Sequence, residues 1–517
     1  MCARFVDERR PVLHTLRPMR LKTLCGLSLC VSVLAASGQT NMTTPKTVSL
    51  SMKECVQLAL LHNRDLQIQR FNPAIARLTL NGSYSYYEPT FSGNVQHSRQ
   101  VSGSTYNPSI GIQQADSDLQ RYDTSLDLSG KLPMGMSYDL SGNYDNTWGI
   151  AKGGAFQTYA PSMGASVTQH LLRDSWTDQG RTTIEVSKRD LKKTELGVDY
   201  TVMDVLTRVQ AAYFELIYAR DNVKVEEKLL EVRERFYRET KRKVEVGTLP
   251  PLEEKLAQSQ VAKVKADLIL ARNTVELDEN TLKSLLGDDF VSSVGTTLVP
   301  SDSLVVVPET FELAESWRRG LAQRPDLTQL KLDVERADLD LKYRYNQLFP
   351  SLDLKAGIGL KGNDPTSAGA FGQMRSRSNP NDLLEVIFSV PLTRTAERAN
   401  YRASKLKRAQ ANVLVKQLEE AILKSIDDAV KNVRTKLESI TATREATVYA
   451  QAALEAEEKK LVAGKSTAYV VLQLQSDLAT AAAAEIRAKA DYNIALAQLY
   501  FVEGSALERN KLAIEIK

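Results

Sequence analysis

Cysteine and histidine are scarce in this sequence of 517 residues, which holds four of each. Cys2, Cys25 and Cys30 lie within the first 38 residues, so that Cys55 stands alone in the remainder. A chain that begins after residue 38 therefore has no intramolecular disulfide. The histidines are scattered, and no Cys/His metal spacing, phosphate-binding glycine loop or serine elbow occurs. We expect no enzyme activity, no cofactor and no bound metal.

An excess of charge of one sign is also missing. The formal net charge is +4, but residues 1–38 hold six Lys/Arg against two Asp/Glu, which leaves 61 basic and 61 acidic residues in the rest. A balanced chain lacks the basic surface that binds nucleic acid. We therefore expect no nucleic-acid partner.

Long apolar runs are absent apart from one near the N-terminus. Arg20 and Lys22 precede the run "LCGLSLCVSVLAA", which ends in the small residues "AASG". This pattern predicts a signal peptide over residues 1–38, cleaved near Ser37, with Met1 or Met19 as the start. A single-pass anchor is the alternative, although the run is shorter than the ~20 residues that span a bilayer. If the exported chain enters a membrane, it must do so as a closed barrel.

Proline and glycine are missing from several very long stretches. Residues 177–246 contain no proline, and residues 395–463, 252–286 and 466–503 contain neither breaker. Apolar residues recur in these stretches at steps of three and four, which predicts long helices packed side by side. Two such stripes are Ala257, Val261, Val264, Leu268, Ala271 and Val275, and Ile422, Ile426, Ala429, Val433, Leu437 and Ile440.

Two segments alternate with period two instead. Residues 89–172 and 350–392 contain stretches such as "MSYDLSGNYD" and "LEVIFSVPL", in which apolar and polar residues take turns. Alternation over about ten residues predicts either transmembrane barrel strands or a soluble antiparallel sheet. The short link "KLPMG" and the longer polar links at 98–122, 148–161 and 362–382 favour the barrel. Aromatic residues near the expected strand ends favour it as well: Tyr84, Tyr86, Tyr87, Tyr144, Trp148, Phe156 and Tyr159.

The two halves of the chain share one plan, which indicates an internal duplication. At a shift of 261 residues Glu54 corresponds to Glu315, and Asp65–Leu66 corresponds to Asp326–Leu327. The first copy is longer because it holds an extra hairpin over residues 124–145, which either widens the barrel or sits at its rim.

Both long helical stretches are interrupted, at "VEVGTLPPLEE" and at "LVAGKSTAYVV". Gly247 and Gly464 suit the left-handed conformation that ends a helix. Pro251 suits the first turn of the next helix, and Ser466 or Thr467 is expected to cap the helix in the second copy. The two segments are predicted to be the tips of helical hairpins.

With its signal peptide, its duplicated helix–strand–long-helix plan and its paired glycine turns, the chain resembles the TolC family of outer-membrane efflux and secretion ducts. The resemblance implies a mixed α and β fold: a trimeric outer-membrane β-barrel that is continuous with a long periplasmic α-helical coiled-coil barrel. It also implies a passive exit duct of a tripartite efflux or type I secretion system. The implied partners are two further copies of the chain, a periplasmic membrane-fusion adaptor, an inner-membrane RND or ABC-type pump, and outer-membrane lipid.

The resemblance assigns adaptor docking to the helix tips and places the protein in the outer membrane of a Gram-negative-type cell, with a periplasmic extension. The docking residues carried over by position are Val246, Gly247, Thr248, Gly464, Lys465, Ser466 and Thr467. These residues also have the simpler role of turning the chain.

Family members narrow the tunnel with acidic side chains after the second tip, where this chain has Val470 and Gln473. Glu253 is the candidate aperture residue, or else a carboxylate at a helix N-terminus.

The predicted domain organisation follows the two copies. The segments are the signal peptide 1–38, a helix in 39–88, strands in 89–172, a helical hairpin and linker in 173–309, a second-copy helix in 310–349, strands in 350–392, a hairpin in 393–503 and a tail in 504–517.

The alternative function is an exported coiled-coil structural or adhesive protein without a pore. The sequence leaves efflux and protein secretion open, because the pump selects the cargo.

Overall fold

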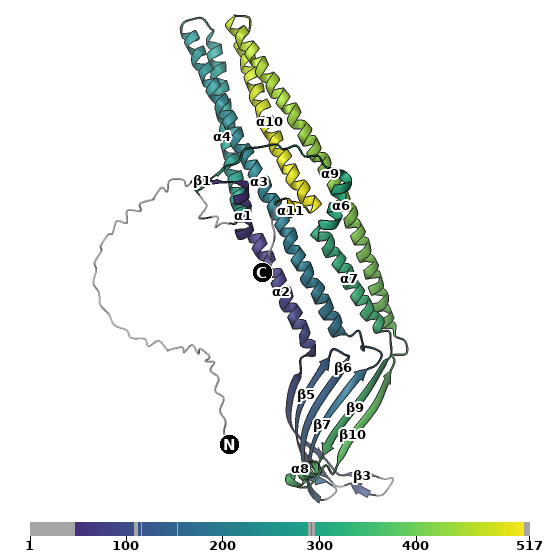
Figure 1. The fold of residues 1–517 in the computed structure, drawn as a ribbon. Helices are drawn as coiled ribbons and strands as arrows, with labels where there is room; N and C mark the ends of the chain where they lie inside the picture. The colour runs from purple at the N-terminus through teal and green to yellow at the C-terminus, as the bar shows by residue number, and fades with distance from the viewer. Residues whose placement is uncertain are drawn as a thin grey trace, which may run out of the picture. The chain divides into compact units, whose positions relative to one another are not determined.

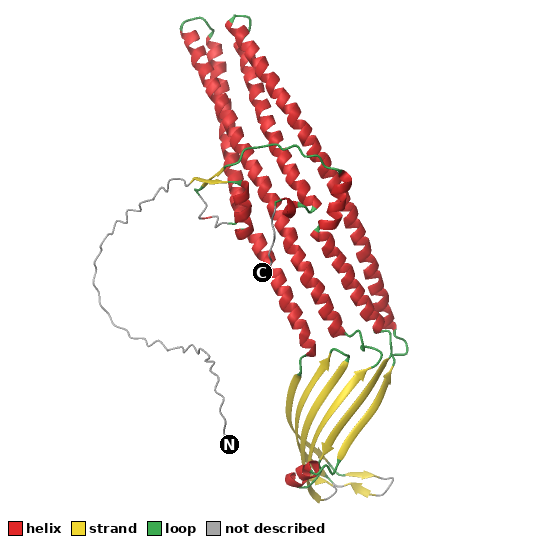
Figure 2. Ribbon diagram, viewed as in Figure 1, coloured by secondary structure: helices red, strands yellow, loops and turns green. Residues whose placement is uncertain are grey.

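Long helices form one end of the described chain and a β-sheet forms the other, as the computed structural model in Figures 1 and 2 shows. The structure describes residues 47–510 except 108–111, 115, 152–153, 288–290 and 292–294. These residues belong to one compact unit, residues 46–517. The predicted signal peptide, 1–38, and with it Cys2, Cys25 and Cys30, lies outside the described residues.

The elements follow one another in two similar series. The first series is β1 (Thr47–Leu50), α1 (Met52–His62), α2 (Arg64–Ser83), the 3₁₀ helix η1 (Tyr84–Tyr87), β2 (Thr90–Ser102), β3 (Thr105–Asn107), β4 (Ile112–Gln114), β5 (Ser117–Leu132), β6 (Met136–Ala151), β7 (Gly154–His170), α3 (Gln179–Glu245) and α4 (Pro251–Leu286). The second series is β8 (Thr297–Pro300), α6 (Leu313–Gln323), α7 (Pro325–Asn346), β9 (Ser351–Lys361), α8 (Ser367–Arg375), β10 (Pro380–Ser389), α9 (Thr395–Val462), α10 (Ala468–Glu503) and α11 (Ala506–Arg509).

Six strands form one antiparallel sheet in the order β10-β9-β7-β6-β5-β2. The hairpin predicted at 124–145 is the inner part of β5 and β6, so it occupies the middle of the sheet and not a rim. Within a single chain the sheet is open, and β2 and β10 are its two edges.

The predicted short link and the predicted alternation are both confirmed. Residues 133–135 connect β5 to β6, and the register places Phe388 opposite Leu352 and Val386 opposite Leu354. Directly opposite residues lie on the same face, so the apolar sets of the two strands meet as expected.

The polar link predicted at 148–161 is wrong, and the link predicted at 98–122 is shorter than expected. The described parts of residues 148–161 belong to β6 and β7, and β2 and β5 extend into 98–122 as far as Ser102 and from Ser117 onward. The ladder continues through these polar stretches because it pairs backbone N–H and C=O groups, which are the same whatever the side chains are. Polarity alone therefore does not end a strand.

The helices form a layer that is four helices wide at each level. Next to the sheet the order of contact is α2, α3, α7 and α9, and farther from the sheet it is α4, α3, α10 and α9. Seam positions predicted from spacing are buried, including Val264, Leu268, Ile422 and Ile426. Among the described residues, no helix has both the length and the apolar composition needed to cross a membrane.

The helices expected within 39–88 and 310–349 are each divided in two. Asn63 ends α1 and caps α2, because its Oδ1 accepts a hydrogen bond from the Leu66 N–H at 3.1 Å. The Asn63 Nδ2 also donates to the Leu285 carbonyl at 2.8 Å, which ties the break to α4. In the second series Pro325 begins α7 and holds Arg324 extended.

The best-packed core lies where α1, α3, α4 and the parallel pair β1–β8 meet. Cys55 is fully buried there, and this burial raises the pKa of its thiol to about 12. A thiol that stays protonated and inaccessible is unreactive.

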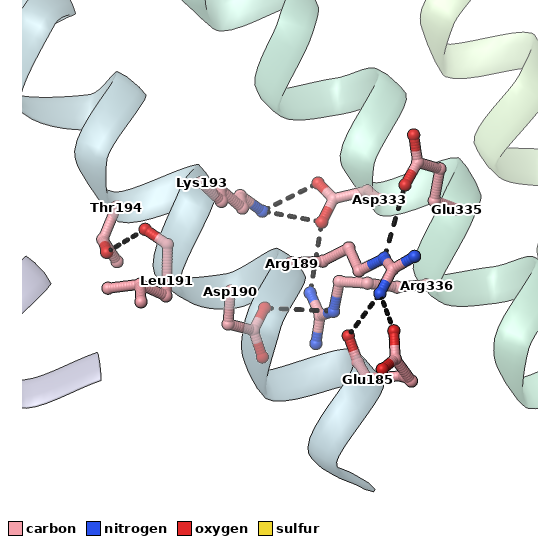
Figure 3. A network of polar contacts seen from close by, with 9 residues as sticks. All are labelled: Glu185, Arg189, Asp190, Leu191, Lys193, Thr194, Asp333, Glu335 and Arg336. Carbon is pink, nitrogen blue, oxygen red and sulfur yellow. Dashed lines mark hydrogen bonds and ion pairs between the residues drawn. The ribbon is translucent and has the colours of Figure 1, made fainter. Parts of the chain in front are cut away.

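Ion pairs join α3 to α7 between this core and the sheet (Figure 3). The Lys193 Nζ lies 2.7 Å from the Asp333 carboxylate, and the Arg336 Nε lies 3.1 Å from that of Asp190. All four side chains are partly exposed, so each ion pair contributes only about 0.2–1 kcal/mol to the free energy of unfolding. The main effect of the network is therefore to determine which surfaces of α3 and α7 face each other, and its contribution to the stability of the fold is small.

Candidate functional site: the two faces of the sheet and the helix tips

One face of the six-stranded sheet is mostly apolar, although Asp382 of β10 lies on it opposite Ile358. The register aligns Phe91, Leu128, Leu140, Ala165 and Ile358 in a single row over five strands. Several side chains of this apolar face are largely exposed, with Phe91 at 69% and Ile358 at 70%. An exposed apolar surface of this extent is typical of contact with a membrane or a partner.

The other face is polar. This face carries the residues that are adjacent in sequence to the apolar row, including Ser92, Asp127 and Ser141. This polar face carries charged side chains of both signs on four strands: Arg121, Asp123, Asp127, Lys131, Asp139, Asp145, Asp353, Lys355, Lys361 and Glu385. The two-residue periodicity thus separates one face suited to hydrocarbon from one suited to water.

Aromatic rings gather at the end of the sheet remote from the helices. Tyr122 and Trp148 stack with ring centroids 5.3 Å apart, and His97 lies 4.6 Å from Tyr122. Phe371 of α8 stacks on Tyr144 at 5.9 Å, so α8 rests on the apolar face there. At the helix end, Tyr84, Tyr86 and Tyr87 form η1, directly before β2. Rings at both ends of an apolar band are typical of barrel proteins.

The first helix tip is a tight turn between α3 and α4. Gly247 has a φ of +78°, as predicted, and its N–H donates to the Val244 carbonyl at 3.0 Å. The Thr248 N–H donates to the Lys243 carbonyl at 2.8 Å, which completes a Schellman motif. Pro251 begins α4, also as predicted, and the Val246 side chain is 74% exposed.

The second tip repeats this hydrogen bonding between α9 and α10. Gly464 has a φ of +72°, and its N–H donates to the Leu461 carbonyl at 3.1 Å. The Lys465 N–H donates to the Lys460 carbonyl at 2.9 Å. The two tips therefore have the same backbone geometry. No hydrogen bond or ion pair joins one tip to the other among the residues that the structure describes.

The predicted side-chain cap of α10 is wrong. Thr467 occupies the N-cap position, but its side chain accepts no capping hydrogen bond. The Ser466 hydroxyl instead donates to the Glu457 carboxylate at 2.5 Å and holds the pKa of that group below its ordinary value, with help from Lys460. The hydroxyl thus ties the loop back to α9 and leaves α10 uncapped.

Glu253 lies in the first turn of α4, where its N–H donates to the Pro250 carbonyl at 3.1 Å. The side chain is half-buried, and within the described chain no ion pair involves it. This position is favourable for a carboxylate because the helix dipole is positive there. The aperture role remains a prediction.

Arg233 is a buried charged residue outside the sites predicted from the sequence. Its side chain is 3% exposed between α3 and α10, and its Nη2 donates to the Leu472 carbonyl at 2.6 Å. Among the described residues, its Nε and Nη1 have no partner, and neither does the nearby Gln475 Oε1. Burial lowers the pKa of the guanidinium. The signal in the sequence is an arginine on an apolar seam, at steps of three and four from Leu230 and Tyr237.

We expect Arg233→Ala to loosen the contact between the two hairpins near their tips. The substitution removes the charge-assisted hydrogen bond from Arg233 to the Leu472 carbonyl, which is worth about 1.5–3 kcal/mol. Amide hydrogen exchange over residues 468–475 should therefore accelerate. Arg235→Ala is the matched control, because Arg235 is 64% exposed and pairs with Glu231 at the surface. Equal exchange in both variants would show that Arg233 does not hold the hairpins together.

The family model of outer membrane efflux proteins matches residues 55–288 and 318–505, which is most of the chain. The chain belongs to this family. The outer membrane protein TolC of Escherichia coli strain K12 is 23% identical over 460 residues, covering 86% of this chain and 89% of TolC. The outer membrane efflux protein BepC of Brucella suis is 23% identical over 359 residues, covering 69% of this chain and 74% of BepC.

Solved structures of similar fold include two outer-membrane proteins. The Campylobacter jejuni CmeC outer membrane channel superposes with a TM-score of 0.65 at 18% identity, covering 88% of this chain and 86% of that one. VceC from Vibrio cholerae gives 0.64 at 15% identity, covering 88% and 96%. The protein is thus an outer-membrane efflux channel and not an enzyme.

Proposed function

We propose that three copies of this chain close into one duct, with an outer-membrane β-barrel that continues into a helical tunnel across the periplasm. One observation carries this proposal. The sheet and the helix layer are both open, and their free edges lie on the same two sides of the chain, because α2 leads into β2 and β10 leads into α9. A neighbouring copy of the chain can therefore pair with the free edge of the sheet and pack against the free edge of the helix layer at the same time.

The directions of the edge strands fit such closure. Five successive antiparallel pairings separate β2 from β10, so the two edge strands run in opposite directions. The β10 strand of one copy therefore meets β2 of the next copy as an antiparallel pair. Unpaired edges are avoided in this way, as a barrel in lipid requires.

The helix edges are apolar as well as free. On α2, exposed apolar side chains recur at steps of three and four: Ile68, Phe71, Ile75 and Leu78, each more than half exposed. On the opposite edge, α9 exposes Leu406 at 71% and Val413 at 64%, one heptad apart. Two such stripes form a coiled-coil seam when α9 of one copy packs against α2 of the next.

The apolar face has the height of a bilayer core. Tyr138 and Trp148 lie on this face of β6, ten residues apart. Ten residues extend ~33 Å along a strand, which is ~25 Å along the axis of a barrel whose strands tilt by ~40°. In this arrangement the apolar face contacts outer-membrane lipid and the polar face lines the lumen.

The helix tips then project into the periplasm and dock to a membrane-fusion adaptor that an inner-membrane RND or ABC-type pump supplies with cargo. Both tips expose an apolar side chain next to their glycine turn, with Val246 at 74% and Val462 at 91%. Conduction is passive, and Glu253 contributes to the aperture. Matching Schellman turns 217 residues apart, at Gly247 and Gly464, support an internal duplication.

The decisive experiment is to extract the mature protein from membranes with detergent and to determine its mass and its conductance in planar bilayers. We expect a trimer that stays in the membrane without detergent and that conducts ions. A monomer that dissolves freely in water would exclude the duct and favour an exported coiled-coil protein. Export of small toxic compounds or of a protein, in cells with a defined pump, then separates efflux from secretion.

A further inference from the structure

The apolar face of the sheet carries one carboxylate that has no cationic partner. Within the six described strands, the Asp, Glu, Lys and Arg side chains on this face are Arg99, Asp118 and Asp382. Arg99 and Asp118 lie on the neighbouring strands β2 and β5 and form an ion pair of 2.6 Å. Asp382 lies on the edge strand β10, is exposed, and forms no ion pair within the described chain. Because a lone charge on a lipid-facing surface is unfavourable, Asp382 calls for a cation from another molecule.

The stagger of the strands indicates where the next copy would pair with β10. One row of directly opposite residues crosses the sheet from Phe91 to Asp382. Phe91 is one residue from Thr90, the end of β2 nearest the helices, and Asp382 is seven residues from Ser389, the corresponding end of β10. This distance thus grows by a little more than one residue at each of the five steps between strands. A sixth step, to β2 of an identical copy, brings the row to about eight residues from Thr90, close to Ser98.

The faces of the strands narrow this register to two. Directly opposite residues lie on the same face, and the apolar face of β2 holds its odd-numbered residues, such as Phe91. The residues of this face that flank Ser98 are His97 and Arg99. Asp382 of one copy is therefore expected to lie opposite His97 or Arg99 of the next copy.

The strand tilt supports the same two registers independently. Pairing with His97 or Arg99 displaces the row by six or eight residues from Phe91 over the six strands of one copy. At ~3.3 Å per residue and ~4.8 Å between strands, these displacements tilt the strands by ~35° and ~42°. Both values fall in the range of ~35–45° found in membrane barrels, whereas displacements of four or ten residues would give ~25° or ~49°.

We propose that Asp382 of each copy forms an ion pair with Arg99 of the next copy, on the lipid-facing side of the seam between β10 and β2. This inference rests on the proposed trimeric duct. In one register Arg99 lies directly opposite Asp382. In the other register it is the diagonal neighbour, at a distance that a long side chain reaches.

Arg99 has the geometry to accept a second carboxylate. Its Nε and Nη2 donate to the two oxygens of Asp118 at 2.9 and 2.6 Å, which fixes the plane of the guanidinium. Its Nη1 donates to no residue of the described chain, and 58% of the side chain is exposed. Each seam would thus hold Asp118, Arg99 and Asp382 in one charge network.

The remainder of the seam does not specify the register. The lipid-facing side chains of β10 below Asp382 are Leu384, Val386 and Phe388, and those of β2 include Phe91 and Val95, all more than 60% exposed in the single chain. Apolar side chains of this kind tolerate a slip of two residues, because such a slip keeps every side chain on its face. The ion pair excludes the slipped registers in which Asp382 would lie opposite Val95 or Val101.

Disulfide cross-linking in isolated membranes tests the register. Asp382→Cys is combined in turn with Val95→Cys, His97→Cys, Arg99→Cys or Val101→Cys. Since Cys55 is fully buried, the Asp382→Cys chain alone gives the background. A disulfide needs Cα atoms within ~7 Å, so we expect covalent oligomers with His97→Cys or Arg99→Cys. Cross-linking at Val95→Cys or Val101→Cys instead, or at none of the four in trimers, would overturn the inference.

Charge substitutions test the ion pair itself. Arg99→Gln should lower the amount of heat-resistant trimer roughly tenfold or more, because each of three seams loses a contact worth about two- to fivefold. Adding Asp382→Asn should restore most of the loss. Arg99 and Asp382 lie on opposite edges of one sheet, so this recovery reports a contact between copies.

Asp118→Asn is the matched control, because Asp118 contacts Arg99 within the same chain. Added to Arg99→Gln, it should restore less trimer than Asp382→Asn does. Recovery with Asp118→Asn but not with Asp382→Asn, or no loss in Arg99→Gln, refutes the ion pair and leaves the proposed duct standing. Absence of trimers of the unsubstituted chain refutes the proposed function itself.

Discussion

Arginine in place of Val386 should prevent the protein from accumulating in the outer membrane. Val386 lies on the apolar face of the edge strand β10 and is 65% exposed in the single chain. A lipid-facing arginine costs about 2–4 kcal/mol at the bilayer midplane and about 0–1 kcal/mol near an interface, and this cost recurs in each of the three copies. The measurement is the amount of heat-resistant oligomer in isolated outer membranes.

Glu385→Arg is the matched control for this prediction. Glu385 is the preceding residue of β10 and lies on the polar face, opposite Lys355. A charge of either sign there remains in the aqueous lumen, so assembly should stay close to normal. If Glu385→Arg abolished assembly and Val386→Arg were tolerated, the two faces would be assigned the wrong way round.

Proline at both helix tips should abolish export and leave the trimer and its barrel intact. In the Gly247→Pro, Gly464→Pro variant, each proline removes an N–H that donates to a helix carbonyl, and its fixed negative φ is incompatible with the +78° and +72° observed. Both turns must rearrange, while the sheet lies at the opposite end of the helices (Figure 1). Export assayed in intact cells should fall to the level of cells without the protein.

Gly295→Pro is the control for the tips. Gly295 also has a positive φ, of +85°. A Cβ added at Gly295 would meet no atom within 4 Å, and the same is true of Gly247 and Gly464. Gly295 differs in its location, because it lies in the connection that follows α4. The same backbone change there should leave export normal. Normal export by the double tip variant, with trimers present, would remove the tips as the docking site.

Local periodicity in the sequence was sufficient to predict the long helices and the strand regions. The steps of three and four that place Ile422 and Ile426 on one stripe, and the alternation that places Val386 and Phe388 on one face, are both set by backbone geometry. The glycine turns were predictable for the same reason, since few other residues adopt a positive φ without strain.

Contacts between distant segments could not be predicted in this way. The break at Asn63 depends on the Leu285 carbonyl, more than 200 residues away, and the burial of Arg233 depends on Leu472. The continuation of β6 and β7 through a polar stretch depends on their pairing with each other. In each case a residue that is distant in the sequence provides a hydrogen-bond partner for a polar group that composition alone would place in a loop or in solvent.

The amino-acid order alone thus determined where the long helices, the strand regions and the two glycine turns occur and which residues share a face, because those properties arise from neighbours a few positions apart. The tertiary structure decided that the extra hairpin lies within the sheet, between β7 and β2, and that the free edges of sheet and helices coincide. Strand order and edges depend on which distant backbones pair, and hydrogen bonds between strands are not encoded in the spacing of side chains along one strand.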